Sequence, residues 1–238
     1  MGDQTQVALV TGASSGIGRE TAVRLAERGF QVLAAARRSD RLNALADRHP
    51  GILPRTVDLS SPEDTEAFCR SLSELEKPVS VLINNAGYSV RGVIEDVSLE
   101  NIRRLFEVNL ISLIRVTQAC LPGMRALRKG TIVNLSSIAG KFVFPASGVY
   151  ASTKHAVEAV TDALRMELAP LGIRVVAVRP GPIATEFNEV GNQWTGDLMA
   201  RTAPDYKPIY QTAGAATGKM FAGLTIPGPE VIAALIME

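Results

Sequence analysis

Short, nearly continuous apolar runs alternate with amphipathic stretches along most of this chain, and this alternation constrains the fold more than any other feature. The apolar runs are rich in β-branched residues and occupy residues 7–11, 31–36, 52–57, 79–83, 131–135 and 174–178. Such runs are typical of strands buried on both faces. Between them, apolar residues recur at three- and four-residue steps, as in Val157, Val160 and Leu164, which predicts helices. Together they predict a doubly wound α/β fold, a parallel sheet between two helical layers, with six strands evident.

The length of 238 residues fits a single domain over residues 1–238, because doubly wound folds often exceed the typical range of about 100–200 residues. We find no internal repeat that would mark a boundary. The alternation stops over residues 180–227, where Gly, Pro and scattered aromatics dominate. Residues 229–238 predict a last helix, with Pro229 in its first turn.

Charge and composition argue against several classes of protein. The net charge is +1 without a long block of like charge, so neither nucleic acid nor an anionic membrane is an expected partner. No apolar run approaches the roughly 18 residues of a membrane span, and the N-terminus lacks a signal-peptide pattern, which together predict a cytoplasmic protein. With two histidines and two distant cysteines, Cys69 and Cys120, neither a metal site nor a disulfide framework is expected.

A glycine-rich turn, TGASSGIG over residues 11–18, joins the first predicted strand to the first predicted helix. At such a turn, glycines let the backbone approach a dinucleotide pyrophosphate, and unpaired N–H groups with the helix dipole hold its charge. The candidate cofactor-binding residues here are Gly12, Ser14, Ser15, Gly16, Ile17 and Gly18. The spacing is Gly-x3-Gly-x-Gly, not the commoner Gly-x-Gly-x-x-Gly, and alone it also fits an ordinary tight turn.

Two rival interpretations of this turn are disfavoured. Residues 12–16 match the Gly-x-Ser-x-Gly nucleophile elbow, but that elbow follows a central strand and needs an acid and then a histidine downstream. Here His49 precedes Asp58, and His155 lies in a helix with a better-supported pattern. A nucleoside triphosphate loop requires lysine where Arg19 stands.

Tyr150 and Lys154 lie four residues apart in a long predicted helix, so their side chains share one face. A tyrosine has a pKa of about 10, and a fixed positive charge nearby favours its phenolate. The pair is a candidate for acid/base catalysis, although a lone Tyr-x3-Lys also fits an ordinary amphipathic helix.

Three further motifs follow predicted strands: NNAG over residues 84–87, NLSS over residues 134–137 and PGPIAT over residues 180–185. With the glycine turn and the Tyr-x3-Lys pair, this ordered set resembles the short-chain dehydrogenase/reductase family over nearly the whole chain. The resemblance implies a Rossmann-like fold and an NAD(P)-dependent oxidoreductase acting on a small-molecule carbonyl or alcohol.

The resemblance implies four catalytic residues. Tyr150 would be the general acid/base, and Lys154 would lower the pKa of Tyr150 and hold the nicotinamide ribose. Ser137 would hydrogen-bond the substrate oxygen, in preference to Ser136, which strand alternation places on the other face. Asn109 would anchor a water that relays protons to Lys154. Asn109 also interrupts an apolar helical stripe, where a buried amide needs partners, so a structural role stays open.

The resemblance also implies where a nicotinamide cofactor binds. Its adenine would meet Asp58 and Leu59, its adenosine ribose would meet Asn85, Ala86 and Gly87, and its carboxamide would meet the segment with Pro180, Gly181, Ile183 and Thr185. Asn84, in contrast, would brace the sheet.

The charge after the second strand predicts which cofactor is used. Enzymes specific for NAD commonly place an acid there, to bind the ribose hydroxyls. Here Arg37 and Arg38 follow the strand, and Asp40 comes only later. Arg37 would contact a 2′-phosphate with Arg38 adding to the field, which predicts NADP(H) in preference to NAD(H). A solvated surface cluster of arginines is the alternative.

Members of the family usually close the sheet with a seventh strand after the last helix, and we expect that strand to be missing here. Its absence would affect a tetramer interface, whereas an interface through residues 101–121 and 150–171 would survive. The expected partner is a second copy of the chain, in a homodimer or a homotetramer.

Residues 186–227 are expected to form the substrate-binding region, because specificity resides in loops at the carboxyl ends of strands. Their apolar and aromatic residues are Phe187, Trp194, Met199, Tyr206, Tyr210, Met220 and Phe221. This content predicts a sizeable apolar alcohol or ketone, as in family branches that act on steroids. The alternative is a non-catalytic dinucleotide-binding sensor or scaffold, which has no need of an acid/base pair.

Overall fold

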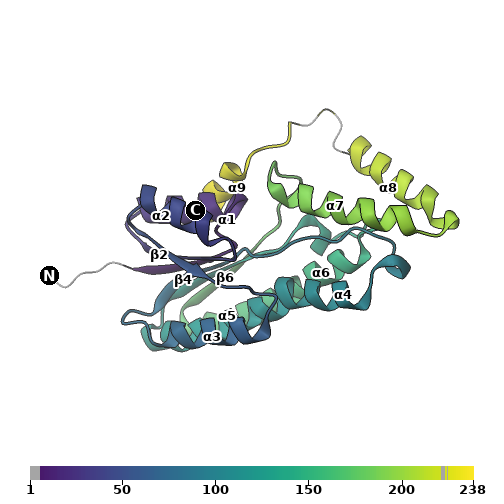
Figure 1. The fold of residues 1–238 in the computed structure, drawn as a ribbon. Helices are drawn as coiled ribbons and strands as arrows, with labels where there is room; N and C mark the ends of the chain where they lie inside the picture. The colour runs from purple at the N-terminus through teal and green to yellow at the C-terminus, as the bar shows by residue number, and fades with distance from the viewer. Residues whose placement is uncertain (1–5, 221–222, 224) are drawn as a thin grey trace.

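The computed structural model describes residues 6–220, 223 and 225–238, with the side chains of these ranges other than those of residues 188–195 and 214–220. Its centre is a six-stranded parallel sheet (Figure 1). The strands are β1 (Val7–Thr11), β2 (Gln31–Ala36), β3 (Ile52–Thr56), β4 (Val79–Asn84), β5 (Gly130–Leu135) and β6 (Ile173–Val178). The predicted strands are confirmed to within one residue at each end.

The strand order is β3-β2-β1-β4-β5-β6, and each neighbouring pair is parallel. The chain leaves β1 toward β2 on one side and later returns to β4 on the other side. This reversal opens a crevice at the carboxyl ends of β1 and β4, which is where ligands bind in open α/β sheets.

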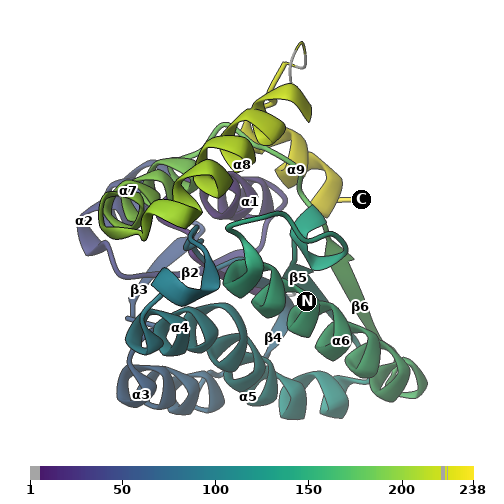
Figure 2. The same cartoon turned by 90° about the vertical axis from the view of Figure 1, so that its right-hand side faces the viewer.

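Helices cover both faces of the sheet, which confirms the predicted three layers. One face carries α1 (Gly16–Glu27), α2 (Ser39–Arg48) and α9 (Pro229–Ile236), and the other carries α3 (Pro62–Ser73), α5 (Ser112–Leu127) and α6 (Gly148–Leu168) (Figures 1 and 2). Alternate residues of one strand supply the two cores. Ala8 and Val10 are buried with Ala22 of α1, whereas Val7 and Leu9 belong to the core on the opposite face.

One helical stretch is longer than the sequence analysis expected. The helix α4 (Leu99–Phe106), the π-helical segment η2 (Glu107–Ile111) and α5 run on without a break over Leu99–Leu127, with a mean hydropathy of 1.2 over the most apolar part. By length and composition alone, this stretch is long enough to cross a membrane. It packs against α3, α6, β4 and β5.

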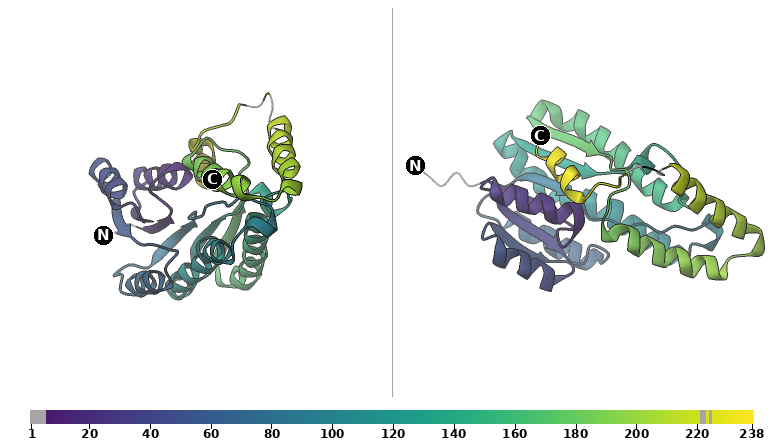
Figure 3. Two further views of the ribbon diagram at one scale, coloured as in Figure 1. Left: turned by 45° about the vertical axis from the view of Figure 1, so that its right-hand side comes forward. Right: turned by 90° about the horizontal axis from the view of Figure 1, so that it is seen from above.

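The segment after β6 is helical, which the sequence analysis did not foresee. The helices α7 (Glu186–Arg201) and α8 (Lys207–Met220) form an arm that extends beyond the carboxyl ends of the strands (Figure 3). Leu198 and Tyr210 of the arm are buried against Val90, Val93 and Leu105. Of the residues predicted to line the pocket here, Phe221 lies outside the described residues, as do the side chains of Trp194 and Met220.

The short elements η1 (Ile94–Asp96), η3 (Ile138–Gly140), η4 (Ala169–Leu171) and η5 (Pro204–Tyr206) complete the described structure. The predicted last helix is α9, which packs against α1. Within residues 6–220, 223 and 225–238, the sheet has the six strands given above and no seventh.

Candidate active site

A cavity of about 990 Å³ is lined by residues that follow the carboxyl ends of the strands and by residues of the arm. It brings together nineteen of the twenty-one predicted site residues. These are Gly12, Ser14, Ser15, Gly16, Ile17, Arg37, Arg38, Asp58, Leu59, Asn85, Ala86, Gly87, Ser137, Tyr150, Lys154, Pro180, Gly181, Ile183 and Thr185. The other two, Gly18 and Asn109, do not line the cavity, and both lie directly behind residues that do.

The glycine turn is tied to the end of β4 by Asn85. The Nδ2 group of Asn85 donates to the carbonyl oxygens of Thr11 (2.9 Å) and Gly12 (3.3 Å), and its backbone N–H donates to Thr11 Oγ1 (3.0 Å). A Cβ on Gly18 would lie 2.4 Å from Asn85 Nδ2 and 2.5 Å from the Gly12 oxygen. Gly18 therefore allows the turn to close, and Thr11, which the sequence analysis did not single out, holds it.

The start of α1 faces the cavity with unsatisfied donors. Ser15 is the N-cap residue, but its side chain makes no capping hydrogen bond, so the first N–H groups of the helix keep their capacity for an anion. Gly12 and Gly16 have φ values of 68° and 55°, which favour glycine. The turn therefore has the geometry and the charge that a pyrophosphate group requires.

Asn109 is held in place by three hydrogen bonds to the protein. Its Nδ2 group donates to the Tyr88 carbonyl (3.0 Å) and to Thr153 Oγ1 (3.1 Å), and its Oδ1 accepts from the Tyr88 N–H (3.1 Å). The residue is 1% exposed and lies in the π-helical segment η2. These bonds fix the orientation of the amide and leave the second lone pair of Oδ1 for a water molecule. Its Oδ1 also lies near Lys154, since a Cβ on Gly87 would be 3.2 Å from Asn109 Oδ1 and 3.7 Å from Lys154 Nζ.

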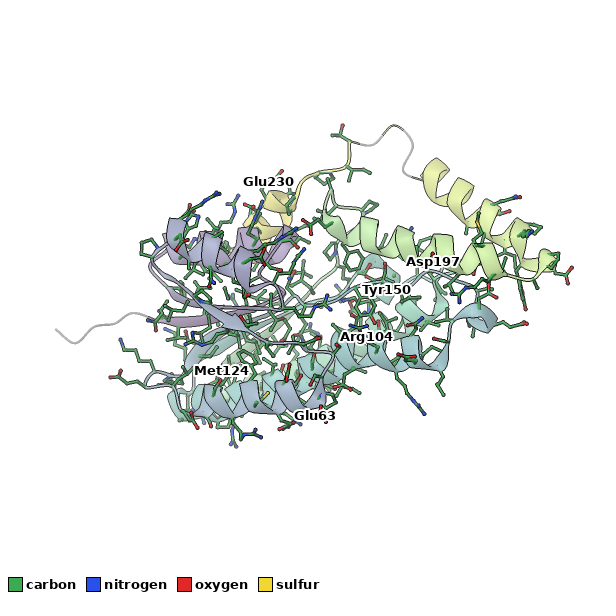
Figure 4. All side chains as sticks on the ribbon, in the orientation of Figure 1. Glu63, Arg104, Met124, Tyr150, Asp197 and Glu230 are labelled. Atoms are coloured by element: carbon green, nitrogen blue, oxygen red, sulfur yellow. The ribbon has the colours of Figure 1, made fainter. Side chains whose placement is uncertain are left out.

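Tyr150 and Lys154 enter the site from the first turns of α6 (Figure 4, where Tyr150 is labelled). Lys154 Nζ donates to the Leu135 carbonyl (2.7 Å) and lies 6.0 Å from the centre of the Tyr150 ring. The ring of Tyr150 packs against Phe187 of α7 at a centroid distance of 5.9 Å. The acid/base pair thus lies between the end of β5 and the start of the arm.

The pKa values of both residues of this pair are shifted from their usual values. Desolvation raises the pKa of Tyr150 to about 12, although the Ser137 hydroxyl and the charge of Arg91 oppose the shift. Burial lowers the pKa of Lys154 to about 8. The net pKa of Tyr150 is therefore above its usual value, because desolvation of the phenolate outweighs the favourable interactions. The lowering that the family resemblance assigns to Lys154 stays a prediction.

Ser137 and Ser136 occupy different environments, as strand alternation predicts. Ser137 caps η3, with its Oγ accepting from the Ala139 N–H (3.1 Å), and its hydroxyl interacts with that of Tyr150. Ser136 is buried toward Glu158, whose pKa it helps to lower against the opposing effect of burial. Ser137 is thus the serine beside the candidate acid/base.

Asp58 and Arg37 lie at the opposite end of the cavity. The Asp58 carboxylate accepts from the Ser60 N–H (2.9 Å) and hydroxyl (2.8 Å). Burial alone would raise the pKa of Asp58, but these hydrogen bonds and the charges of Arg37 and Arg104 hold the pKa below its usual value. Arg104, labelled in Figure 4 on α4, was missed because its position within a helical pattern carries no sign of a site.

Arg38 does not stand free beside Arg37. Its Nε and Nη2 groups donate to Ser14 Oγ (3.1 and 3.0 Å), Nη2 also donates to Ser15 Oγ (2.7 Å), and Nη1 pairs with Glu186 (2.7 Å). The sequence analysis did not identify Glu186, since nothing in the local pattern predicts that α7 starts against the glycine turn.

The segment after β6 crosses the cavity toward the glycine turn. The Pro180 carbonyl accepts from the Ile138 N–H (3.1 Å), and Ile183 is buried in the core. Thr185 precedes α7 and lies so close to the turn that a Cβ on Gly16 would be 3.2 Å from its Cγ2 atom. This segment therefore connects the end of β6, beside η3, with the glycine turn.

Other candidates from the sequence stay outside the site. Asn84 donates to Thr117 Oγ1 (3.0 Å) and to Asn134 Oδ1 (2.9 Å), so it braces the sheet as expected. His155 is exposed on α6, and Cys69 and Cys120 are buried free thiols. Among the side chains that the structure describes, no group of three or more His, Cys, Asp and Glu residues is placed to hold a metal ion.

The geometry agrees with the comparison with known proteins. The sequence profile of the family described as "short chain dehydrogenase" matches residues 6–196, which is most of the chain. The chain belongs to the short-chain dehydrogenase/reductase family. It is therefore an oxidoreductase of the class that interconverts alcohol and carbonyl groups with NAD(P).

Three individual members of the family are similar to this short-chain dehydrogenase/reductase over most of its length. The uncharacterized oxidoreductase YbbO of Escherichia coli K12 is 38% identical over 193 residues, which cover 79% of this chain and 70% of the relative. A solved short-chain dehydrogenase from Streptomyces avermitilis has a TM-score of 0.84 and 30% identity, covering 100% of this chain and 84% of the other. A short-chain dehydrogenase from Sphingobium yanoikuyae in complex with NADPH has a TM-score of 0.75 and 35% identity, covering 79% and 75% of the two chains.

Proposed function

We propose that this short-chain dehydrogenase/reductase is an NADP(H)-dependent enzyme that transfers a hydride between nicotinamide and a sizeable, apolar carbonyl or alcohol substrate. One observation carries the proposal. A single cavity is lined by the glycine turn and Arg37 at one end and by Tyr150, Lys154 and Ser137 at the other. A dinucleotide is the ligand class that needs a pyrophosphate cradle and an acid/base pair in one site.

The residues of the turn fit a dinucleotide. A side chain at Gly12 would meet Asn85 Nδ2 at 2.8 Å and the Ala86 backbone at 2.9 Å, so only glycine leaves the turn in place beneath a phosphate group. The N–H groups at the start of α1 would hold the pyrophosphate, and Asp58 and Leu59 would lie at the adenine. Lys154 would hold the nicotinamide ribose, and the segment from Pro180 to Thr185 would hold the carboxamide.

The protein's own groups move the proton. A bound nicotinamide supplies or accepts the hydride. With a pKa raised to about 12, Tyr150 stays protonated at neutral pH, so its phenol is a proton donor to the substrate oxygen in the direction of reduction. Ser137 would hold that oxygen, and the ammonium of Lys154 would stabilise the phenolate left on Tyr150. Asn109 would anchor a water molecule, and that water would relay the replacement proton to Lys154.

The choice of NADP(H) rests on Arg37. This residue follows β2, lines the cavity and acts on Asp58 through its charge. In the described structure it has no hydrogen-bond or ion-pair partner, so its guanidinium is available to a 2′-phosphate. The NADPH complex of the Sphingobium yanoikuyae enzyme supports the same choice.

The substrate class rests on the walls of the cavity near Tyr150. The aromatic residues Tyr88, Phe187 and Tyr210 lie there, and Arg91 is the charged lining residue whose charge acts on Tyr150. Phe144 and Ile226 add apolar surface elsewhere in the same cavity. Phe187 and Tyr210 come from the arm, so residues 186–227 form the substrate-binding region of a single domain spanning residues 1–238. We propose that the enzyme works in the cytoplasm as a homodimer or homotetramer.

Turnover with purified protein tests this function. We expect NADPH absorbance to fall with hydrophobic ketones, and Tyr150→Phe to lower turnover by about 10² to 10⁴ while leaving NADPH binding intact. The change removes only the hydroxyl group, so we expect folding and the ring contact with Phe187 to persist. NADPH binding without turnover over a broad panel of carbonyls and alcohols would instead favour the sensor or scaffold.

A further inference from the structure

The first residue of the arm carries a carboxylate to the arginines at the cofactor end of the cavity. We propose that Glu186 is a cofactor-selectivity residue, an internal anion that binds Arg38 and Arg41 and competes there with the 2′-phosphate of NADP(H). The inference rests on the proposed function and deepens it, because it concerns how strongly the same site favours NADP(H).

The contacts define a compact cluster of Arg38, Arg41 and Glu186. Glu186 Oε2 pairs with Arg38 Nη1 at 2.7 Å, and Glu186 Oε1 pairs with Arg41 Nη1 at 2.6 Å. The remaining bonds of Arg38 fix its guanidinium on Ser14 and Ser15 of the glycine turn. Both carboxylate oxygens of Glu186 are therefore used. Arg38 and Glu186 line the cavity, so Glu186 Oε2 occupies an Arg38 donor that a phosphate on the adenosine ribose could use.

The ion pairs of this cluster can be replaced by ion pairs with a bound phosphate. The side chains of Arg38, Arg41 and Glu186 are 40%, 42% and 42% exposed, and exposed ion pairs contribute little to stability. Hydrogen bonds from Arg38 and Arg41 hold the pKa of Glu186 below its usual value, so the carboxylate is charged at neutral pH. A 2′-phosphate carries more charge than a carboxylate and can displace it, whereas the neutral ribose hydroxyls of NAD(H) cannot.

Arg37 favours the 2′-phosphate over Glu186 in this competition. It stands beside the cluster in sequence and lines the same cavity, but among the described residues it forms no ion pair. Two arginines thus share the Glu186 carboxylate, and Arg37, whose charge also acts on Asp58, adds positive charge beside them for a phosphate. Glu186 moderates this charge, so removing its negative charge strengthens the preference for NADP(H).

The test is a binding titration of Glu186→Gln, which keeps the shape and removes the charge. We expect NADPH to bind Glu186→Gln about two- to fivefold more tightly than it binds the unmodified protein, which is the effect expected from losing one exposed charge. The affinity for NADH should change much less. The fragments 2′,5′-ADP and 5′-AMP, which reach only the adenosine end, should repeat this difference. Fluorescence of the reduced cofactor and calorimetry with the fragments measure binding without turnover.

Glu66→Gln is the matched control. Glu66 of α3 pairs with Arg115, its side chain is also 42% exposed, and it does not line the cavity. Its substitution changes the net charge equally and should leave both affinities unchanged. If the ratio of NADPH affinity to NADH affinity in Glu186→Gln were unaltered or lowered, the role of Glu186 would be overturned and the proposed function would stand. If the unmodified protein bound neither dinucleotide, the proposed function would fail first.

Discussion

Burial acts in opposite directions on the two titrating residues of the site. It disfavours the phenolate of Tyr150 and raises its pKa to about 12, and it disfavours the ammonium of Lys154 and lowers its pKa to about 8. The pair therefore holds a firmly protonated phenol beside a lysine that loses its charge within an accessible pH range. This combination suits reduction, in which the phenol gives up its proton only when the substrate oxygen takes it.

A pH dependence follows for the reduction reaction. As pH rises through about 8, Lys154 loses its proton and no longer stabilises the phenolate forming on Tyr150, so kcat/KM should fall on the alkaline side. Initial rates from pH 6 to 10 at a fixed hydrophobic ketone measure this. Lys154→Arg, which keeps its charge, should show no such fall in whatever activity it retains. A flat profile for the unmodified enzyme up to pH 10 would remove Lys154 from this role.

At the scale of elements, the site depends on how β1, α1 and β4 meet. The glycine turn is held by Thr11 and Asn85, and Gly18 leaves the space that Asn85 Nδ2 occupies. Most of this region was predictable, because strand ends and glycine spacing are local features. The hydrogen bonds of Asn85 were not, because they join residues about 74 positions apart.

Gly18→Ala tests the closure of the turn. The added Cβ would collide with backbone and with Asn85, so we expect a loss of about 1–3 kcal/mol in the free energy of unfolding, together with weaker NADPH binding. Gly196→Ala in α7 is the control, since a Cβ there meets nothing within 4 Å and alanine favours a helix. Urea denaturation and cofactor titration compare the two variants. Equal stability of both variants would show that the turn accommodates a Cβ at residue 18 without strain.

The arm and the π-helical segment are the elements that the sequence did not predict. Residues 186–227 mix glycine, proline and aromatics, and the pattern gives no clear helical stripe, so burial of Leu198 and Tyr210 against the body becomes evident only in three dimensions. In η2, Asn109 interrupts an apolar stripe, which indicated a special role but not the widened helix that lets its amide reach Tyr88 and Thr153.

At the scale of the whole molecule, the strand order determines where the cofactor-binding and catalytic residues lie. The switch between β1 and β4 opens the crevice, α1 brings the turn to one end, and α6 brings Tyr150 and Lys154 to the other (Figures 1 and 4). Alternating apolar runs predicted this architecture because each strand is buried on both faces. The runs did not predict that Glu186 and Arg104, from segments distant in the sequence, bring charges to the site. Such long-range pairings leave no periodic signal in the sequence.

The comparison of NADPH and NADH as cofactors for one ketone tests the central claim most directly. In steady-state assays on the same preparation, kcat/KM for NADPH should exceed that for NADH. In Arg37→Ala the value for NADPH should fall about tenfold or more, as expected for a charge-assisted contact with phosphate, with NADH much less affected. Equal use of the two cofactors by the unmodified enzyme, a preference for NADH, or no oxidation of either with any carbonyl would contradict the account.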